Sequence, residues 1–580
     1  MLKKILIIAA HITASVMWLF VLLQSESIFS VNVCTAVLSL LALLYLLNHE
    51  IRFEKKSDIV GIVILSLAYT ASNCLANHYL LAVRSTIVFF LSGFIIGGCI
   101  FTALWHYFGH RVPKQNQNAY HPKKVFFLCL VLFAASYLSF LFLFASPGNL
   151  TQDSMIQVTQ SITGDFTNHH PFWHTVTIMI CVRIGSALFH SVNTGVLLYS
   201  ILQALFMAVS FAYICASIYR ISRSKALLTV CAAYFGLMPF NVSYSVSMWK
   251  DVPFGICVGV FTVALYRTVR SVGNRKLNYT VLLLSGIGFG IFRSNGLIAL
   301  AITFFFSLFF LFKKYKKALL MMLIAIVVAA IMTVPVVKLL HVQPVRFTES
   351  ISIPLQQVSR VVSNGEKLEK DEAELIEKVI SLDTVKEKYT PYISDPVKFA
   401  ITDEGDAYLK EHKADYLKLW FKIGLRHPGT YVKAWVEQTK GYWNSCYRRW
   451  RWANEMYEND YGIQKITPEP AVDKMYQDYF NVFKTSFMET FVSIGLYTQF
   501  FIFGLIFFLF KRKKETVITL PALANIATLL IATPVYAEFR YAYSLFVCFP
   551  ILLCALMCIN SKAPDNHSYE EKSSNSRRFR

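Results

Sequence analysis

The sequence predicts an all-α polytopic membrane protein with about 14 transmembrane helices. Hydrophobic residues make up 55% of its 580 residues and charged residues only 16%, whereas a soluble chain carries nearer a quarter charged residues. Apolar runs of about 20 residues, the length that crosses a bilayer, recur along the chain, and no β-type alternation or internal repeat interrupts them. This composition excludes a soluble enzyme, a disordered scaffold and a fibrous repeat.

The apolar runs form three groups along the chain. They lie near 3–24, 31–48, 58–80, 85–107 and 124–145, then 195–219, 225–245, 252–270, 277–293, 295–312 and 317–340, and last 486–510, 515–535 and 541–560. The first run is longer than the apolar part of a signal peptide and lacks a clear cleavage site, so we expect a retained helix. The polar segment FRSNG divides 277–293 from 295–312, which predicts two spans or one broken helix with an added turn.

The net charge of +21 is explained by loops on one side of the membrane. With the N-terminus inside, every loop that would be cytoplasmic is rich in Lys or Arg, as is typical of multi-pass proteins. The outer segment 341–485, by contrast, carries 21 basic and 22 acidic residues. We therefore expect a multi-pass protein of the plasma membrane with both termini cytoplasmic, and no nucleic-acid partner.

The segment 174–190 is apolar but short, and it contains Arg183. If it crossed the membrane, every later loop would change sides and the Lys-rich loops would lie outside. We therefore expect a helix that lies in the outer interface without crossing, with a short tilted span as the alternative.

This topology predicts five parts of the chain. They are an accessory four-helix membrane module over 1–108, a membrane core over 124–340 with an outer loop over 146–194, a mainly helical extracytoplasmic domain over 341–485, a three-helix membrane part over 486–560, and a disordered cytoplasmic tail over 561–580.

Polar residues gather on the predicted outer face, where burying charge near a membrane usually reflects function. They are Asp153, Asp165, His169 and His170 in the outer loop, Trp249-Lys250-Asp251, Arg293-Ser294-Asn295, and Glu538-Phe539-Arg540-Tyr541. Each has a simple structural alternative: Asp153 could cap a helix, the histidines could lie in a solvated turn, Arg293 could reach the headgroups, and the other charges could form surface ion pairs. The inner loops are Lys-rich, without acidic or His partners.

This combination of side chains suits a substrate with a phosphate and a hydroxyl acceptor. Arg and Lys bind phosphate, and an Asp accepts a proton from an attacking hydroxyl. A divalent cation, Mg or Mn, held by Asp153 and His169 could neutralise a leaving phosphate. A sugar linked through phosphate to a membrane lipid meets these requirements.

The run SPGNLTQDSMIQVTQSITGDFTNHHPFWHTVTIMICVRIGSALF resembles the start of the core of GT-C type membrane glycosyltransferases, which include protein O-mannosyltransferases and aminoarabinose transferases. WKDVPFG, FRSNG and EFRYAYS are similar to motifs of an uncharacterised bacterial branch. The resemblance covers roughly 124–560. Four additional spans before the core and the position of the large outer domain depart from the usual layout.

The resemblance implies a GT-C-like core with Asp153 as the catalytic acid of the outer loop and Asp165 as its rival. Apart from the resemblance, the common depth of Lys250, Arg293 and Arg540, and the cost of leaving a cation at the membrane edge without a counter-charge, predict that these three residues bind the donor phosphate. The remaining residues of the four clusters are expected to support them: His169, His170, Asp251, Asn295, Glu538 and Tyr541.

The expected function is an inverting glycosyltransferase that moves a sugar from a polyprenyl-phosphate donor to an envelope glycan, lipid or protein on the outer face, in contact with membrane lipids. A transporter or flippase for lipid-linked sugars or envelope polymers is the main alternative. A non-catalytic assembly or sensor protein, with 341–485 as its binding module, is the third.

Overall fold

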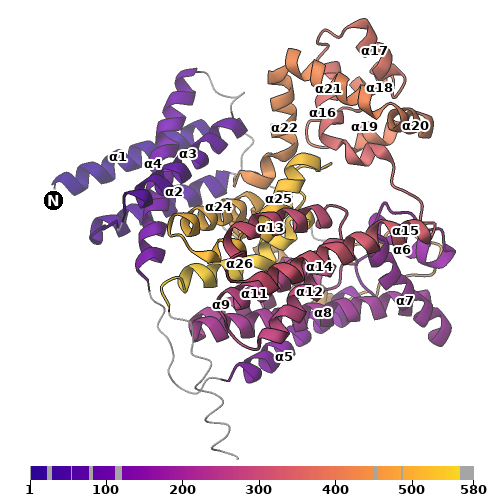
Figure 1. Cartoon of the computed structure of the whole chain (residues 1–580), viewed down its shortest axis with the longest axis horizontal. Helices are drawn as coiled ribbons and strands as arrows, with labels where there is room; N and C mark the ends of the chain where they lie inside the picture. The colour runs from indigo at the N-terminus through magenta and orange to yellow at the C-terminus, as the bar shows by residue number, and fades with distance from the viewer. Residues whose placement is uncertain are drawn as a thin grey trace, which may run out of the picture.

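The computed structural model describes residues 2–22, 29–53, 55–77, 83–111, 121–445, 447, 454–484 and 488–561. These residues form helices, turns and isolated β-bridges, with no named strand among them, which confirms the all-α prediction for the described part (Figure 1). Nine described helices are long and apolar enough to cross a membrane, and five shorter apolar helices accompany them. The chain is a multi-pass membrane protein, while the number of 14 spans stays a prediction.

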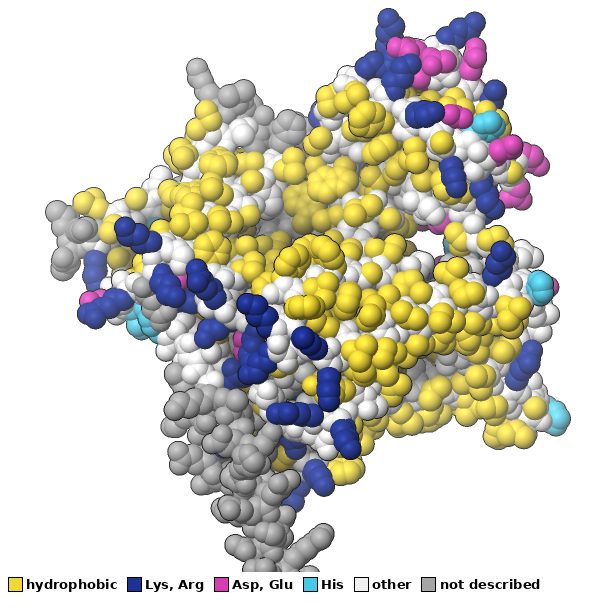
Figure 2. All heavy atoms as spheres, viewed as in Figure 1, with side chains coloured by type: hydrophobic (Ala, Val, Ile, Leu, Met, Phe, Trp, Pro, Cys, Tyr) yellow, Lys and Arg dark blue, Asp and Glu magenta, His cyan; other side chains and the backbone are white. Residues whose placement is uncertain are grey.

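The sides of the helix bundle are covered by hydrophobic side chains (Figure 2). Leu128, Phe309 and Ile531, for example, are each about 70% exposed on three different helices. Soluble proteins rarely expose a contiguous apolar surface of such extent. The exposed apolar surface therefore fits contact with lipid chains.

The N-terminal module packs against the remainder of the chain near both ends of one of its helices. Its helices are α1 (Leu2–Leu22), α2 (Phe29–Asn48), α3 (Lys56–Asn77) and α4 (Val83–His110). At the start of α3, Lys511 Nζ lies 3.1 Å from a carboxylate oxygen of Asp58. At the end of α3, the Asn444 amide donates to Asn73 over 3.1 Å. The module is thus fastened to the core by polar contacts at each end.

The membrane core is built around a single buried helix, α11. The core helices are α5 (Pro122–Phe140) with a π-helical turn at Leu141–Ala145, α8 (Val192–Ser222), α9 (Lys225–Leu237), α10 (Pro239–Tyr244), α11 (Asp251–Val269), α12 (Arg275–Ile291), α13 (Gly296–Leu311), α14 (Lys316–Thr333), α15 (Pro335–Leu339), α24 (Ile494–Phe510), α25 (Leu520–Ala532) and α26 (Tyr543–Met557). Short 3₁₀ segments lie at Phe347–Ser350, Met488–Val492, Lys514–Ile518 and Phe539–Ala542. Nearly every residue of α11 is buried, between α8, α12 and α26.

Two glycines of α11 allow α26 to approach closely. Gly255 and Gly259 form a G-x-x-x-G pattern, which is typical of tightly packed membrane helices. A Cβ at Gly255 would lie 2.7 Å from the Tyr543 ring, and a Cβ at Gly259 would lie 2.3 Å from Val547. Because the two helices meet along these residues, the start of α11 lies beside the segment that precedes α26.

Several predicted spans are shorter or divided in the structure. The predicted span 225–245 divides into α9 and α10 because Pro239 begins a new helix there. The pair at 277–312 forms two separate helices, α12 and α13, instead of one broken helix. The run predicted from 486 enters α24 only at Ile494.

The outer loop forms α6 (Gln152–Thr163) and α7 (Phe172–Phe189). A Cβ at Gly185 of α7 would lie 2.3 Å from the backbone nitrogen of Gly195, so α7 and α8 form a tight hairpin. By length and composition α7 also qualifies as a candidate span. Its predicted position in the outer interface therefore stays a prediction.

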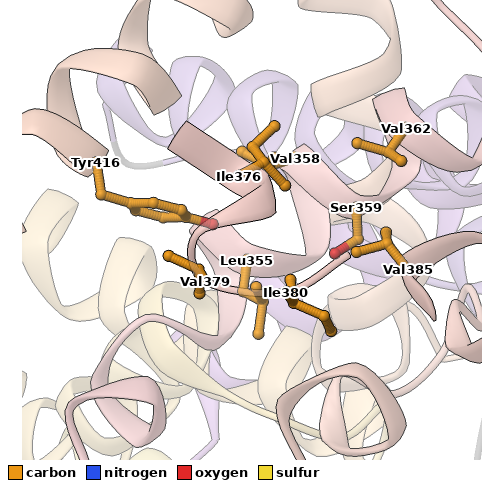
Figure 3. A pocket seen from close by; sticks show the side chains of 9 residues that line it. All are labelled: Leu355, Val358, Ser359, Val362, Ile376, Val379, Ile380, Val385 and Tyr416. Atoms are coloured by element: carbon orange, nitrogen blue, oxygen red, sulfur yellow. The ribbon is translucent and has the colours of Figure 1, made fainter. Parts of the chain in front are cut away.

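The segment after α15 forms a separate helical core at the top right of Figure 1. Its helices are α16 (Ser352–Ser363), α17 (Lys370–Glu377), α18 (Leu382–Lys388), α19 (Asp395–Ala400), α20 (Asp403–Glu411), α21 (Lys413–Arg426) and α22 (Pro428–Trp443). Side chains from α16, α17 and α18 meet around a void of about 10 Å³ (Figure 3). A void of this size holds about one water molecule, so this core is packed and holds no ligand-sized space there.

The chain then returns from this helical core to the outer loop. The Leu150 amide donates to the Glu455 carbonyl over 2.9 Å, and the Ile466 amide donates to the Ser146 carbonyl over 2.9 Å. The helix α23 (Pro470–Val482) packs its Tyr476 ring against Phe140 of α5. The returning segment thereby supports the loop that carries Asp153.

Candidate functional site

The N-terminus of α6 positions Asp153. Thr151 is the N-cap residue of this helix, and it forms a reciprocal capping box with Ser154. Asp153 lies inside the first turn, so capping is not its role. Its carboxylate instead accepts a hydrogen bond from Arg540 over 2.7 Å. The structure thus rules out the simple capping alternative for Asp153.

The same helix start is fastened to the Trp249-Lys250-Asp251 motif. The Trp249 indole donates to the Thr151 hydroxyl over 2.9 Å, and the Ser154 hydroxyl donates to the Met248 carbonyl over 2.8 Å. A short parallel β-bridge between Asn149 and Ser247 adds backbone contacts. These bonds fix Asp153 relative to the first residues of α11.

Charged side chains form two ion pairs at increasing depth. The outer pair is Asp153 with Arg540, whose side chains are 34% and 17% exposed. The deeper pair is Asp251 with Arg293, which are 0% and 9% exposed. Arg540 also lies 3.5 Å from a carboxylate oxygen of Glu538. The outer pair therefore remains accessible to a ligand, whereas the deeper pair is enclosed by protein.

Lys250 lies beside both pairs, without a carboxylate partner within 4.0 Å among the described residues. Its ammonium donates to His170 Nδ1 over 2.8 Å, so His170 accepts this bond as a neutral imidazole. The other ring nitrogen of His170 is buried, without a hydrogen-bond partner among the described residues. Lys250 is therefore a cation held in place by a neutral group.

The electrostatic environment keeps Asp153 ionised. Burial by itself raises the pKa of Asp153, but the positive charges of Arg540 and Lys250 outweigh it, and the pKa lies well below its usual value. Burial and the neighbouring Lys250 hold the pKa of His170 far below its usual value. Burial lowers the pKa of Lys250, and the carboxylates of Asp153 and Asp251 oppose this shift.

The deeper pair is held by a polar network from the turn before α13, from α25 and from the 3₁₀ segment that contains Tyr541. Arg293 Nε donates to the Asn295 side chain over 3.0 Å, and the Asn295 amide donates to Thr528 over 2.7 Å. The Asn525 amide donates to the Tyr541 carbonyl over 2.9 Å. Arg293 also lies over the Tyr541 ring, 4.5 Å from its centroid. This network positions the segment that carries Arg540. Its contacts also engage the guanidinium group of Arg293.

His169 points to the helical segment that follows α15 instead of the ion pairs. Its Nδ1 lies 3.9 Å from a Glu349 oxygen, and Glu349 also accepts a hydrogen bond from Lys398 over 2.7 Å. Burial is the largest cause that lowers the pKa of His169. His169 therefore joins the outer loop to this segment.

The structure does not bring Asp165 to the cluster. Asp165 is exposed just beyond the C-terminus of α6, about 15 Å or more from the helix start that carries Asp153. The predicted metal site also lacks a suitable donor set, because Asp153 is paired with Arg540 and His169 faces Glu349. Among the described residues, no group of three or more His, Cys, Asp or Glu could hold a metal ion.

Sequence reasoning missed the residues that hold the charged groups in place. Thr151, Asn525 and Thr528 lie in apolar or loop segments with no charge to mark them. Tyr442, whose hydroxyl accepts a bond from the Glu538 amide over 3.1 Å, lies in another distant segment. Of these residues, only Asn525 could have been found from the sequence, because an amide within the apolar run 515–535 needs a hydrogen-bond partner.

The fold and this cluster define a multi-pass helical membrane protein with paired charges near one end of its central helix. Residues 159–573 match the model of a family of unknown function, DUF6020, and the chain belongs to that family. The matched range contains His170, Lys250, Arg293 and Arg540, and it begins after Asp153. No curated protein matches the chain, and no solved structure matches it.

Proposed function

We propose that the protein is a membrane glycosyltransferase of the inverting GT-C type. It transfers a sugar from a polyprenyl-phosphate donor to a hydroxyl acceptor of the cell envelope on the outer face of the membrane. The observation that carries the proposal is the accessible pair of Asp153 and Arg540 beside Lys250, a half-buried cation that has no carboxylate within 4.0 Å among the described residues.

The cations fit the phosphate of the donor. A phosphate that enters beside Asp153 meets Arg540, which presents a planar set of donors, and Lys250, which acts as a point charge. Neutral His170 leaves the full charge of Lys250 available to an anion. Arg293 lies deeper and is engaged with Asp251, so we assign it to positioning Tyr541 and the segment of Arg540.

The transfer step needs a proton acceptor and a stabilised leaving group. The acceptor hydroxyl oxygen forms a bond to the anomeric carbon of the sugar while the bond from that carbon to the phosphate oxygen breaks. The electron pair of the broken bond leaves with the lipid phosphate, whose charge Arg540 and Lys250 stabilise. The proton of the hydroxyl passes to the carboxylate of Asp153.

Donor binding would also make Asp153 a better base. In the free protein, Arg540 is paired with this carboxylate and helps to lower its pKa. A bound phosphate neutralises part of the positive charge of Arg540 and Lys250, so the pKa of Asp153 moves back toward its ordinary value. The carboxylate is then freed to face the acceptor hydroxyl when the donor is in place.

Binding of polyprenyl phosphate tests the proposal without knowledge of the sugar, because transfer of any sugar from such a donor releases this lipid. We expect the wild-type chain in detergent to bind it, and Lys250→Gln and Arg540→Gln each to weaken binding by about tenfold or more. Lys338→Gln is the matched control, since Lys338 is exposed on α15 and outside the cluster. Chelation of divalent ions should leave binding unchanged, because the proposed counter-charges are side chains.

Transfer itself is measured in membranes supplied with polyprenyl-phosphate hexoses. Sugar transfer that the Asp153→Asn change abolishes supports the enzyme. Normal lipid-phosphate binding by Lys250→Gln and Arg540→Gln would contradict the phosphate assignment. Movement of the intact donor across the membrane by the Asp153→Asn protein, with no transfer by the wild type, would favour the transporter.

A further inference from the structure

We infer that the chain binds the headgroup of an anionic phospholipid at the end of the helix bundle predicted to be cytoplasmic, between the N-terminal module and the core. Two adjoining cavities of about 600 Å³ and 200 Å³ lie there, and both are lined by Lys513, Ile559 and Asn560. The other cationic residues that line them are Arg270, Arg512 and Lys514 in the larger cavity and Lys55 and Lys511 in the smaller. We call this pair of cavities the basic groove.

The charges of the basic groove are not balanced by its carboxylates. Glu515 is the acidic residue of the lining, and Arg270 engages it over 3.3 Å. Lys514 donates to the Tyr315 hydroxyl over 2.5 Å. Arg512 and Lys513 have no ion-pair partner within 4.0 Å in the described part of the chain. Two adjacent cations are therefore left to bind an anion.

The groove is assembled from segments that are far apart in the sequence. The Asn560 side chain donates to the Gly109 carbonyl over 2.7 Å, and Arg270 donates to the Ser561 carbonyl over 2.6 Å. These bonds join the ends of α4, α11 and α26 around the cavities. Figure 2 shows Lys and Arg side chains gathered over this end of the bundle. Basic residues that served only to set membrane orientation would not need to be brought together around shared cavities.

The lining favours a lipid over a free anion. Phe507 and Ile559 line the smaller cavity but are almost fully buried, whereas the neighbouring Leu509 offers exposed apolar surface on the side of α24. Basic pockets between membrane helices on the cytoplasmic side are suited to anionic headgroups, whose phosphates lie at this depth. Two adjoining cavities that share Lys513 suit a headgroup with two phosphates, which would bridge the module and the core.

The test uses the full chain in phosphatidylcholine nanodiscs with or without cardiolipin or phosphatidylglycerol. We expect cardiolipin to raise the thermal midpoint and to remain bound in native mass spectrometry, with phosphatidylglycerol weaker and inorganic phosphate without effect. The change Arg512→Gln with Lys513→Gln should weaken cardiolipin binding by about tenfold or more. Lys513→Gln alone provides a milder variant, and an unchanged midpoint in phosphatidylcholine shows that each variant is folded.

Lys313→Gln with Lys317→Gln is the matched control. Lys313 is exposed in the loop between α13 and α14, and Lys317 is exposed in the first turn of α14; both lie at the same predicted side, and neither lines the groove. The control should keep the wild-type response to cardiolipin. An equal loss in the control would show a general effect of surface charge and overturn the inference. Equal stabilisation by inorganic phosphate would overturn the lipid assignment, and so would the absence of any response to anionic lipid.

Discussion

The cations at the two ends of the central membrane helices have different neighbours. Near the start of α11, Arg540 and Arg293 are each paired with a carboxylate, Asp153 and Asp251. At the other end, the basic groove holds more cations than carboxylates. Paired charges fix geometry and allow a proton or phosphate to be exchanged, whereas unbalanced cations attract any anion that fits. The comparison predicts chemistry at the first end and lipid retention at the second.

Breaking the deeper pair should give the largest effect. Asp251→Ala leaves Arg293 buried without its counter-charge, and removing one partner of a buried pair costs about 3–5 kcal/mol. We expect a marked fall in the thermal midpoint in detergent. Glu50→Ala is the control because the pair of Glu50 with Arg52 is exposed, and such pairs contribute about 0–1 kcal/mol. An equal, small fall for both variants would contradict the structural role of the deeper pair.

The outer pair should affect turnover more than stability. Asp153→Asn removes the proton acceptor, and we expect sugar transfer to fall by about 10²-fold, the usual scale for loss of a general base. The helix start should persist because Thr151 is the N-cap residue. Asp165→Asn is the matched control, since this exposed carboxylate lies away from the cluster. Full activity of a folded Asp153→Asn protein would exclude this residue as the base.

Much of the fold follows from the sequence because membrane helices obey strong local constraints. The backbone polar groups of the runs near 3–24 and 195–219 need hydrogen-bond partners within the membrane, which a helix supplies, and both runs form one. The boundaries were weaker predictions where a proline intervenes, as at Pro239. The location of Asp153, Lys250, Arg293 and Arg540 at one end of the bundle was also predictable, because the topology places their segments on the same predicted side.

The pairing within the site could not be predicted from the sequence. Asp153 and Arg540 are 387 residues apart, and their contact depends on the packing of α26 against α11. The choice between Asp153 and Asp165 depended on which end of α6 faces the motif at Trp249. The position of Arg293 depended on its neighbour Asn295 and on the side-chain amide of Asn525 in α25, whose partners no local pattern specifies.

A small change in the contact between α11 and α26 should lower both the stability of the protein and its binding of polyprenyl phosphate. Gly259→Ala places a methyl group where the Val547 side chain lies, and we expect a loss of about 1–3 kcal/mol in stability from overpacking. Because α26 follows the segment of Arg540, polyprenyl-phosphate binding should weaken as well. Gly429→Ala is the control, since no atom lies within 4 Å of the added group. Unchanged stability and binding in Gly259→Ala would show that this contact does not position the site.

The smallest predicted effect is a shift in the pH dependence of kcat/KM. This shift separates the effect of the charge of Arg540 from the effect of its planar donor geometry. Burial raises the pKa of Asp153, but Arg540 and Lys250 hold it below the ordinary value of about 3.9. The stabilisation from this carboxylate is therefore present above about pH 4 and is lost only as the pH falls through the lower folded value. For the wild type, the profile of kcat/KM should show no acid limb from Asp153 above about pH 5.

Arg540→Gln removes the nearest positive charge, so the pKa of Asp153 rises and an acid limb should appear at higher pH than in the wild type. Arg540→Lys keeps the charge but loses the planar donor geometry, so its rate should fall without a comparable shift of the limb. The shape of each profile, normalised to its own maximum, separates the two variants. Identical profiles for Arg540→Gln and Arg540→Lys would mean that this arginine acts on Asp153 through geometry alone. The charge pairing that distinguishes this end of the helices would then have no role in the proton transfer.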